Sequence, residues 1–319
     1  MKRYLVTGGA GFIGSSITHK LLEEGNFVRV FDNQFRGSQN KFSKNSHFEF
    51  VQGDIRLIKN VERACKGIDT IVHLAYINGT KYFYEKPDLV LDVGVKGMVN
   101  ILDAARHHKV KEFFLASSSE VYQNPPIIPT PEDVPLIVPD PYNPRFSYGG
   151  GKILSELMAI HIGKTIFKKA VIFRPHNVYG PDMGNEHVIP ELIKKIVHTD
   201  EKIIRIQGSG DETRAFIYID DFVSGLSLIL KRGKNMETYN VGTDEEISIR
   251  DLANFLLEAS GKNLNVVKGK KREGSPKRRC PDITKLKKLG FKPSVSLNEG
   301  LQKTFIWYNN QYLHHAKTS

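Results

Sequence analysis

The chain has 319 residues and a formal net charge of +11, from 46 lysines and arginines against 35 aspartates and glutamates. Its 40% hydrophobic and 25% charged content is ordinary for a globular protein and excludes a disordered or fibrous chain. No apolar run reaches the ~18–20 residues that span a bilayer, and the first residues turn into glycines too early for a signal peptide, so neither is expected.

The first half of the chain alternates short apolar runs with helical patterns, which is typical of βα units on a parallel sheet. Helices are expected where apolar residues recur at helical spacing, at about 13–22, 89–107 and 148–163. Strands are expected at residues 4–6, 27–31, 48–51, 70–74, 113–116 and 170–174. The pattern predicts an α/β fold with one doubly wound, Rossmann-type parallel sheet.

The second half is less regular. Segment 124–144 is rich in proline and is expected to form an irregular loop. Beyond it we expect helices near 188–198, 221–230, 249–259 (capped by Gly261) and from 297 onward, and strands near 203–207, 215–219 and 239–241. The chain is therefore divided into a nucleotide-binding domain at 1–180, to which strands and helices from about 214–242 return, and a smaller α/β domain at 181–319.

A glycine-rich segment, GGAGFIG at residues 8–14, follows the first expected strand and opens the first helix. Its glycines let the backbone turn tightly and approach a pyrophosphate, whose charge a helix N-terminus favours. Asp32 ends the second strand 18 residues after Gly14, where a carboxylate accepts hydrogen bonds from ribose hydroxyls and repels a 2′-phosphate. These features predict a dinucleotide site for NAD rather than NADP, although the nearby Arg36 mildly favours NADP.

Two further strand ends face the same expected site. Asp54 follows the third strand and is a candidate acceptor for the adenine amino group, although an ordinary loop aspartate is the alternative. Leu74 and Ala75 end the fourth strand, where backbone and small side chains can line a cofactor.

Tyr148 and Lys152 stand four residues apart at the start of an expected helix, so both side chains leave the same face. A lysine cation beside a phenol favours the phenolate, and so does the positive nicotinamide ring of oxidised NAD, so the pKa of Tyr148 should fall well below its usual ~10. A phenolate can take a proton from an alcohol while hydride leaves to a nicotinamide. The serines of segment 117–120 end the fifth strand and can bridge substrate and tyrosine, unless they serve only as turn residues.

With these motifs in place, the chain resembles the extended short-chain dehydrogenase/reductases that modify nucleotide sugars. The resemblance covers nearly the whole sequence and rests on TGGAGFIG (7–14), DN (32–33), GDIR (53–56), HLA (73–75), ASSSEVY (116–122), YGGGK (148–152), RPHNVYGP (174–181), RAFIYIDD (214–221), YNVG (239–242) and RRCPDITKLKKLGFKP (278–293). It implies NAD in the Rossmann half, a nucleotide-diphosphate sugar in the C-terminal half, and hydride removal, usually from C4 of the sugar. The cofactor contacts expected are Gly8, Gly11, Phe12, Ile13, Gly14, Asp32, Asn33, Asp54, Ile55, Leu74, Ala75, Tyr148 and Lys152.

The resemblance also assigns roles at the substrate. Tyr148 is the base, Lys152 orients it and the nicotinamide ribose, and Ser118 holds the sugar hydroxyl. The resemblance implies that Asn177, Arg214 and Arg279 hold the diphosphate, which a planar guanidinium matches well. The substrate contacts expected are Ser118, Ser119, Tyr148, His176, Asn177, Arg214 and Arg279.

The reaction that follows the 4-keto intermediate stays open between several outcomes. A 4-epimerase needs only rotation of the ketone and return of hydride to its other face. A 4,6-dehydratase must also abstract the C5 proton and expel the C6 hydroxyl, a decarboxylase must lose CO2 from a uronic acid, and a net C4 dehydrogenase releases NADH. The frequency of these activities in the family favours 4-epimerisation.

Glu120 bears on this choice, because it resembles the glutamate of the Thr-x-Glu segment in GDP-mannose 4,6-dehydratase and UDP-glucuronate decarboxylase, where it could act as acid or base. Against those activities, Ser119 replaces the aspartate of dTDP-glucose dehydratases, and residues 149–151 lack the acidic residue of decarboxylases. Three further departures from the family pattern line the presumed sugar end and indicate a non-standard sugar: Tyr76, Gly94 and His176.

The remaining expectations concern partners and location. Helices near 95–108 and 148–163 resemble the pair that dimerises this family, so a homodimer is expected. Cys65 and Cys280 can form neither a disulfide framework nor a zinc site, which favours a cytoplasmic protein without a metal. The basic cluster at 268–277 is interpreted as solvated surface, so neither nucleic acid nor membrane is an expected partner. The alternative of another class is a non-catalytic NAD- or RNA-binding relative.

Overall fold

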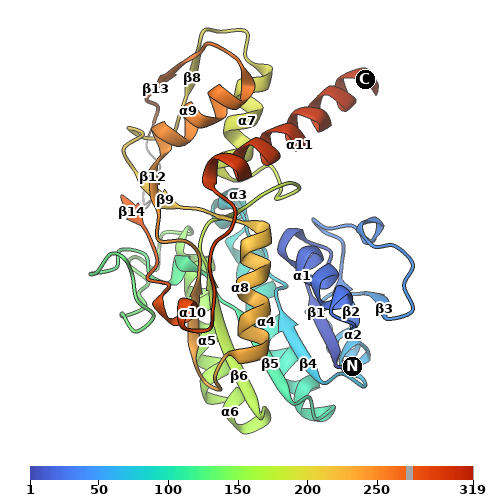
Figure 1. Cartoon of the computed structure of the whole chain (residues 1–319). Helices are drawn as coiled ribbons and strands as arrows, with labels where there is room; N and C mark the ends of the chain where they lie inside the picture. The colour runs from blue at the N-terminus through green and yellow to red at the C-terminus, as the bar shows by residue number, and fades with distance from the viewer. Residues whose placement is uncertain (271–275, 319) are drawn as a thin grey trace.

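The computed structural model describes residues 1–270 and 276–318, so Lys271 and Arg272 of the basic cluster lie outside the described residues (Figure 1). Its central sheet has seven parallel strands in the order β11-β6-β5-β4-β1-β2-β3. The strands are β1 (Arg3–Thr7), β2 (Phe27–Asp32), β3 (Phe48–Gln52), β4 (Thr70–His73), β5 (Glu112–Ala116), β6 (Lys169–Pro175) and β11 (Thr238–Val241). The predicted fold class, a doubly wound α/β sheet, is confirmed.

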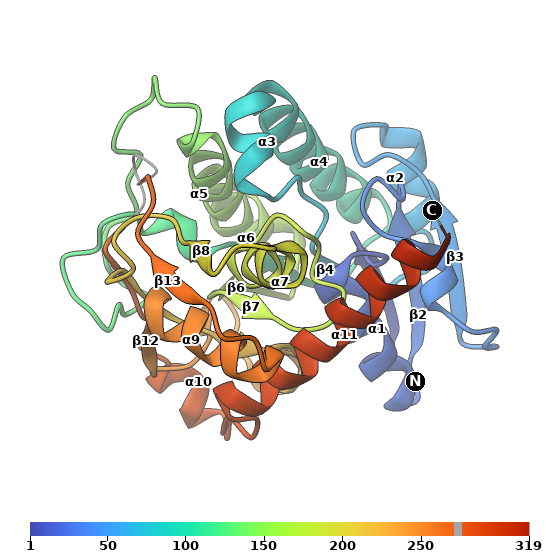
Figure 2. The ribbon, with the colours of Figure 1, turned by 90° about the horizontal axis from the view of Figure 1, so that it is seen from above.

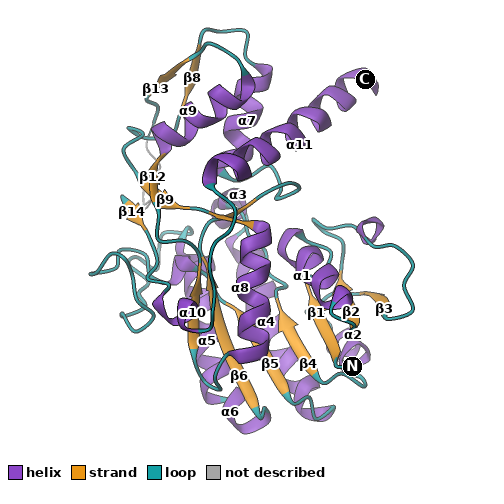
Figure 3. Cartoon of the chain, viewed as in Figure 1, coloured by secondary structure: helices purple, strands orange, loops and turns teal. Residues whose placement is uncertain are grey.

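Helices cover both faces of this sheet (Figure 3). Neighbouring strand residues point to opposite faces of the sheet. Val6 therefore packs with α1 (Phe12–Glu23) and α8 (Ile219–Arg232) on one face, whereas Leu5 packs with the helices of the other face. The helices of that second face are α2 (Ile58–Cys65), α4 (Pro87–His107), α5 (Phe146–His161) and α6 (Gly163–Ile166). Because the sheet is buried on both faces, the strands have nearly continuous apolar sequences instead of alternating ones.

The C-terminal half builds a cap above the carboxyl ends of the strands, as Figures 1 and 2 show. Its helices are α7 (Val188–His198), α9 (Ile249–Ser260) and α11 (Leu297–Thr318), whereas α10 (Thr284–Lys288) packs beside β11 of the central sheet. Its short strands are β7 (Val178–Tyr179), β8 (Ile203–Arg205), β9 (Thr213–Ala215), β10 (Ile217–Tyr218), β12 (Glu246–Ser248), β13 (Asn265–Val267) and β14 (Arg278–Arg279). The predicted cap of α9 is present, since Gly261 has φ 66°.

The chain crosses the boundary at residue 180 and returns, because β11 pairs with β6 along residues 238–241. The division into 1–180 and 181–319 stays a prediction. Two expected elements differ in detail: the strand at 215–219 is split between β9 and β10, and α8 begins at Ile219. In the described part of the chain, no helix combines the length and apolarity needed to cross a bilayer.

Candidate active site

The glycine-rich turn between β1 and α1 is shaped by close backbone contacts. A Cβ on Gly14 would lie 2.2 Å from the carbonyl oxygen of Gly8, and a Cβ on Gly8 would lie 2.8 Å from the backbone of Ala75. Gly8 also has φ 69°, which favours glycine. Gly11 caps α1 without a side chain, so the first-turn amides are free to meet an anion. The turn therefore fits the diphosphate of a dinucleotide.

Asp32 lies at the end of β2 beside this turn. Its carboxylate accepts hydrogen bonds from the amides of Ala10 (3.0 Å) and Gln34 (2.7 Å). Burial raises the pKa of Asp32, and the two amides oppose that shift. Asp54 differs, because hydrogen bonds from Arg56 lower the pKa of its carboxyl.

A cavity of about 400 Å³ joins these groups to the catalytic residues. Every residue predicted to contact the cofactor lines it: Gly8, Gly11, Phe12, Ile13, Gly14, Asp32, Asn33, Asp54, Ile55, Leu74, Ala75, Tyr148 and Lys152. The glycine turn, the Asp32 carboxylate and the cavity together fit NAD.

Tyr148 and Lys152 leave the first turns of α5 and meet Ser118, which follows the end of β5. The phenol of Tyr148 is hydrogen-bonded to Ser118. Lys152 donates from Nζ to the carbonyl oxygen of Ala116 at 2.7 Å. Tyr148, Lys152 and Ser118 are only 6%, 3% and 8% exposed, so this group works in a dry environment.

The protein's own groups raise the pKa of Tyr148 instead of lowering it, so the part of the prediction that rests on Lys152 is wrong, and the part that rests on oxidised NAD stays a prediction. Burial raises the pKa of the phenol, and the hydrogen bond from Ser118 only partly opposes the shift. Burial also lowers the pKa of Lys152 to about 7, which weakens the cation that should favour the phenolate.

The helix α3 (Thr80–Glu85) was not expected from the sequence, yet it supplies Phe83 to the site. The Phe83 ring stacks on the Tyr148 ring with centroids 4.8 Å apart and an interplanar angle of 16°. The aromatic run Tyr82–Tyr84 was the available signal, but six residues are too few to show a helical period.

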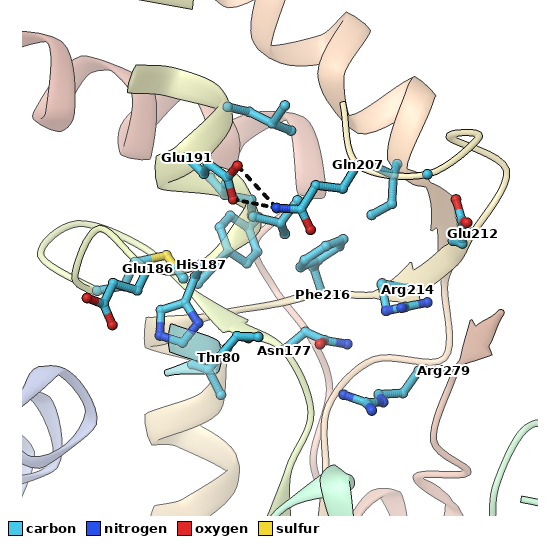
Figure 4. Close-up of a pocket in the computed structure, with 18 of the residues that line it drawn as sticks. Thr80, Asn177, Glu186, His187, Glu191, Gln207, Glu212, Arg214, Phe216 and Arg279 are labelled. Atoms are coloured by element: carbon cyan, nitrogen blue, oxygen red, sulfur yellow. Dashed lines mark hydrogen bonds between the residues drawn. The ribbon is translucent and has the colours of Figure 1, made fainter. Parts of the chain in front are cut away.

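A second cavity, of about 240 Å³, opens beside the first and is lined mostly by residues of the C-terminal half (Figure 4). Asn177, Arg214 and Arg279 lie together on it, as the resemblance implied. The two arginines are opposite each other on the paired strands β9 and β14. Burial and the charge of Arg279 lower the pKa of Arg214 to about 10, and the carboxylates of Glu120 and Glu212 oppose that shift.

At the other end of this cavity, Gln207 donates to both carboxylate oxygens of Glu191 at 3.2 and 3.1 Å. The ring of Phe216 lies between that pair and the arginines (Figure 4). The cavity thus has a cationic end, an aromatic middle and a hydrogen-bonding end.

Glu120 lies where the two cavities meet, clamped by two guanidinium groups. Arg279 donates from Nη1 to Oε1 at 2.7 Å, and Arg145 places Nη2 3.7 Å from Oε2. Burial disfavours the charged form of Glu120, but the two arginines outweigh burial and hold its pKa at about 2. Arg145 was missed in the sequence, where its only signal is a position three residues before Tyr148.

The expected substrate contacts other than His176 are divided between the two cavities. Ser118, Ser119 and Tyr148 line the first cavity, Arg214 lines the second, and Asn177 and Arg279 line both. His176 is 1% exposed, lies outside the residues that line either cavity, and shares a hydrogen bond of 3.1 Å with Oδ1 of Asn240. The prediction that His176 contacts substrate is therefore corrected, because its side chain packs toward β11.

Comparison with known proteins places this geometry among enzymes of nucleotide sugars. The model of the NAD dependent epimerase/dehydratase family matches residues 4–242. UDP-glucuronic acid decarboxylase 1 of Xenopus tropicalis is 32% identical over 99% of this chain and 74% of its own length. Among solved structures, the UDP-glucose 4-epimerase of Thermotoga maritima with UDP-glucose superposes with a TM-score of 0.87, at 28% identity over 97% of this chain and 99% of that one. The dTDP-glucose 4,6-dehydratase of Streptomyces venezuelae, with NAD bound, has a TM-score of 0.86 at 28% identity, covering 98% of each chain.

Proposed function

The chain belongs to the NAD-dependent epimerase/dehydratase family, and on that premise we propose that it interconverts the C4 epimers of a nucleotide-diphosphate sugar. It is an NAD-dependent enzyme. The resemblances cover epimerases, dehydratases and decarboxylases alike, so the choice among these reactions rests on the side chains of the site.

The residues of the cavities divide the work of this reaction. Asn177, Arg214 and Arg279 bind the diphosphate, and the ring of Phe216 offers a flat surface to the nucleobase. Ser118 orients the C4 hydroxyl toward Tyr148, which removes the hydroxyl proton as the C4 hydrogen leaves with its electron pair. NAD, which the glycine turn and Asp32 would hold, would supply hydride acceptance and return, and its positive nicotinamide ring would favour the Tyr148 phenolate that burial disfavours.

The second half of the reaction needs no additional acid or base. After the 4-keto sugar turns its other face, hydride returns to C4 and Tyr148 gives the proton back to the oxygen. The substrate and product then have the same composition, and both protein and cofactor end as they began.

One observation carries the choice of epimerisation, namely the clamp on Glu120. A dehydratase needs a base for the C5 proton and a proton donor for the departing C6 hydroxyl, and Glu120 is the side chain that the resemblance offered for these roles. With a pKa of about 2, that carboxyl holds no proton to donate at neutral pH, and its carboxylate is a weak base toward the C5 hydrogen. Its charge is satisfied by Arg279 and Arg145, so it serves best as a fixed structural anion.

A second candidate, decarboxylation of a nucleotide-linked uronic acid, is favoured by a different observation. Nε of Arg145 and Nη2 of Arg279 are buried atoms that have no hydrogen-bond partner among the described residues. A sugar carboxylate is a suitable acceptor for such groups, because guanidinium binds carboxylates in a planar arrangement.

Product mass distinguishes the candidates. Purified protein is incubated with UDP-, GDP- and CDP-linked hexoses and uronic acids, and products are followed by mass spectrometry and proton NMR. Epimerisation predicts a product of unchanged mass with inverted C4. Loss of water overturns the proposal in favour of the dehydratase, loss of carbon dioxide supports the decarboxylase, and loss of two hydrogens indicates a net dehydrogenase.

We also propose that the enzyme is a homodimer formed through α4 and α5. These two helices pack against each other, and each leaves large apolar side chains exposed. Leu91 and Val99 on α4 are 41% and 40% exposed, and Leu154 and Leu157 on α5 are 40% and 48% exposed. Sedimentation of the purified protein tests this, and a monomer at micromolar concentration overturns it.

A further inference from the structure

Tyr76 lies just beyond β4 and lines the cofactor cavity between the two catalytic side chains. Nζ of Lys152 is 4.0 Å from the centroid of the Tyr76 ring. The Tyr148 ring meets the same ring edge-on, with centroids 5.1 Å apart and an interplanar angle of 87°. One aromatic ring therefore contacts both the base and the lysine that assists it.

Two glycines on different helices leave the space that this tyrosine fills. A Cβ on Gly94 of α4 would lie 2.2 Å from Oη of Tyr76, and a Cβ on Gly151 of α5 would lie 2.1 Å from the same atom. At Gly94 the three nearest atoms all belong to Tyr76, and at Gly151 the next contacts are at ordinary distances of 3.5 and 3.6 Å. Tyr76 and Gly94, two departures from the family pattern, thus form one packing unit with Gly151.

The hydroxyl of Tyr76 does not explain why Tyr76, Gly94 and Gly151 pack together. Oη is buried and has no hydrogen-bond partner in the described part of the chain. A buried polar atom without a partner costs stability. The aromatic ring, which touches the catalytic groups, is therefore the functional part of the side chain.

The Tyr76 ring offsets the effect of burial on the Lys152 ammonium. Burial disfavours the ammonium, and the negative face of an aromatic ring stabilises a cation most strongly where water is excluded. The other charged or titratable groups around the pair come from several elements, and they are Glu156 on α5, His73 on β4, Glu120 after β5 and Arg36 after β2. Glu156 is already paired with Arg174 at 2.7 and 2.8 Å, which reduces its help to the lysine.

We propose that Tyr76 is a positioning residue of the active site, whose ring holds the Lys152 ammonium charged and in place beside Tyr148, and that Gly94 and Gly151 exist to admit it. This inference rests on the proposed roles of Tyr148 and Lys152. It does not depend on which reaction follows hydride removal, because that step is common to all the candidates.

Two substitutions distinguish the effect of the aromatic ring of Tyr76 from the effect of the space that its side chain fills. Tyr76→Phe keeps the ring, and we expect kcat and its pH profile within about twofold of the unsubstituted enzyme, since only an unpartnered hydroxyl is lost. Tyr76→Leu keeps apolar bulk without the ring, and we expect kcat to fall about tenfold with KM nearly unchanged. Because Lys152 then loses its proton more easily, the alkaline limb of the kcat profile, where the ammonium is lost, moves to lower pH. Equal behaviour of the two variants overturns the proposal.

A readout without turnover keeps this test separate from the proposed function. NMR of protein labelled at the lysine ε-carbons, with Lys152→Arg to assign the signal, follows the titration of Lys152 directly. The pKa of Lys152 is expected to be lower in Tyr76→Leu than in Tyr76→Phe. If the two variants titrate alike, the proposal fails even when an epimerase product is found; if they differ and no epimer is found, only the proposed function fails.

Thermal unfolding tests the packing unit independently of activity. Gly151→Ala is expected to lower Tm sharply in the unsubstituted protein, because its Cβ meets Tyr76. In a Tyr76→Ala background the same change is expected to be neutral or stabilising, since alanine favours a helix by ~1 kcal/mol over glycine. A Tm loss from Gly151→Ala that is the same in both backgrounds contradicts the unit.

Discussion

The two cavities of this enzyme are built in different ways. The cofactor cavity is formed around a continuous backbone turn, in which glycines at 8 and 14 leave no room for a Cβ. The substrate cavity is formed by side chains from distant segments, with Glu120, Arg214 and Arg279 converging from three parts of the chain. The first therefore depends on space and the second on charge, and substitutions should affect them differently.

The largest effect is expected where the cavities meet. Tyr148→Phe removes the group that exchanges the proton, so kcat should fall by about 10²–10⁴-fold while NAD binding is kept. Product formation under saturating substrate measures this loss. Tyr142→Phe is the control, since Tyr142 is 93% exposed and should retain full activity. Full activity of Tyr148→Phe would remove the catalytic assignment.

A steric change should break the cofactor cavity alone. Gly14→Ala forces a Cβ toward the Gly8 carbonyl, so NAD affinity should fall by at least about tenfold because the turn must open. Titration with NAD, followed by calorimetry, measures the change. Gly163→Ala is the matched control, because a Cβ there meets no atom closer than 3.5 Å. Unchanged NAD affinity in Gly14→Ala would contradict the backbone account of this cavity.

A charge change should break the substrate cavity alone. Arg279→Gln removes a cation that the diphosphate and Glu120 share, so KM should rise about 10–100-fold with NAD affinity unchanged. Arg278→Gln is the control, because that neighbouring side chain is 53% exposed and bonds Glu246 instead. If both variants raise KM equally, the effect is one of net charge and the assignment of Arg279 to the diphosphate is wrong.

The last prediction concerns stability rather than activity, as a dependence of the free energy of unfolding on pH. Lys152 has an unfolded pKa near 10.5 and a folded pKa of about 7, so the unfolded chain binds more protons between those values. The free energy of unfolding should therefore rise with pH across that window, by at most about 1.4 kcal/mol per pH unit. Lys152→Met should lack this contribution. Denaturant unfolding of both proteins from pH 7 to pH 10 measures the difference, and parallel curves would contradict a buried lysine with a lowered pKa.

The difference between the cavities also explains what the sequence could predict. The glycine turn and Asp32 are adjacent in sequence to the strands that position them, and every predicted cofactor contact lines the cofactor cavity. The side-chain partners of Glu120 lie 25 and 159 residues away, so their effect on its charge could not be seen before folding. For the same reason the orientation of His176 toward Asn240 was not foreseen.

Burial accounts for the other differences between the predictions from sequence and the structure. The sequence placed Lys152 beside Tyr148 and predicted a lowered phenol pKa, but it could not show that both groups are almost fully enclosed. Desolvation is then the largest influence on the pKa of each of the two groups. The departure at Tyr76 was visible in the sequence, whereas its fit between Gly94 and Gly151 needed the packing of α4 on α5.

The central claim is that chemistry is confined to C4 of the sugar, because Glu120 is a clamped carboxylate without a proton to give. Incubation with substrate in heavy water tests this directly, with deuterium at each sugar carbon followed by NMR. Epimerisation through a 4-keto sugar without further acid or base predicts inverted C4 and no deuterium at C4 or C5. Deuterium at C5, with or without loss of water, would contradict the account and restore Glu120 as an acid or base.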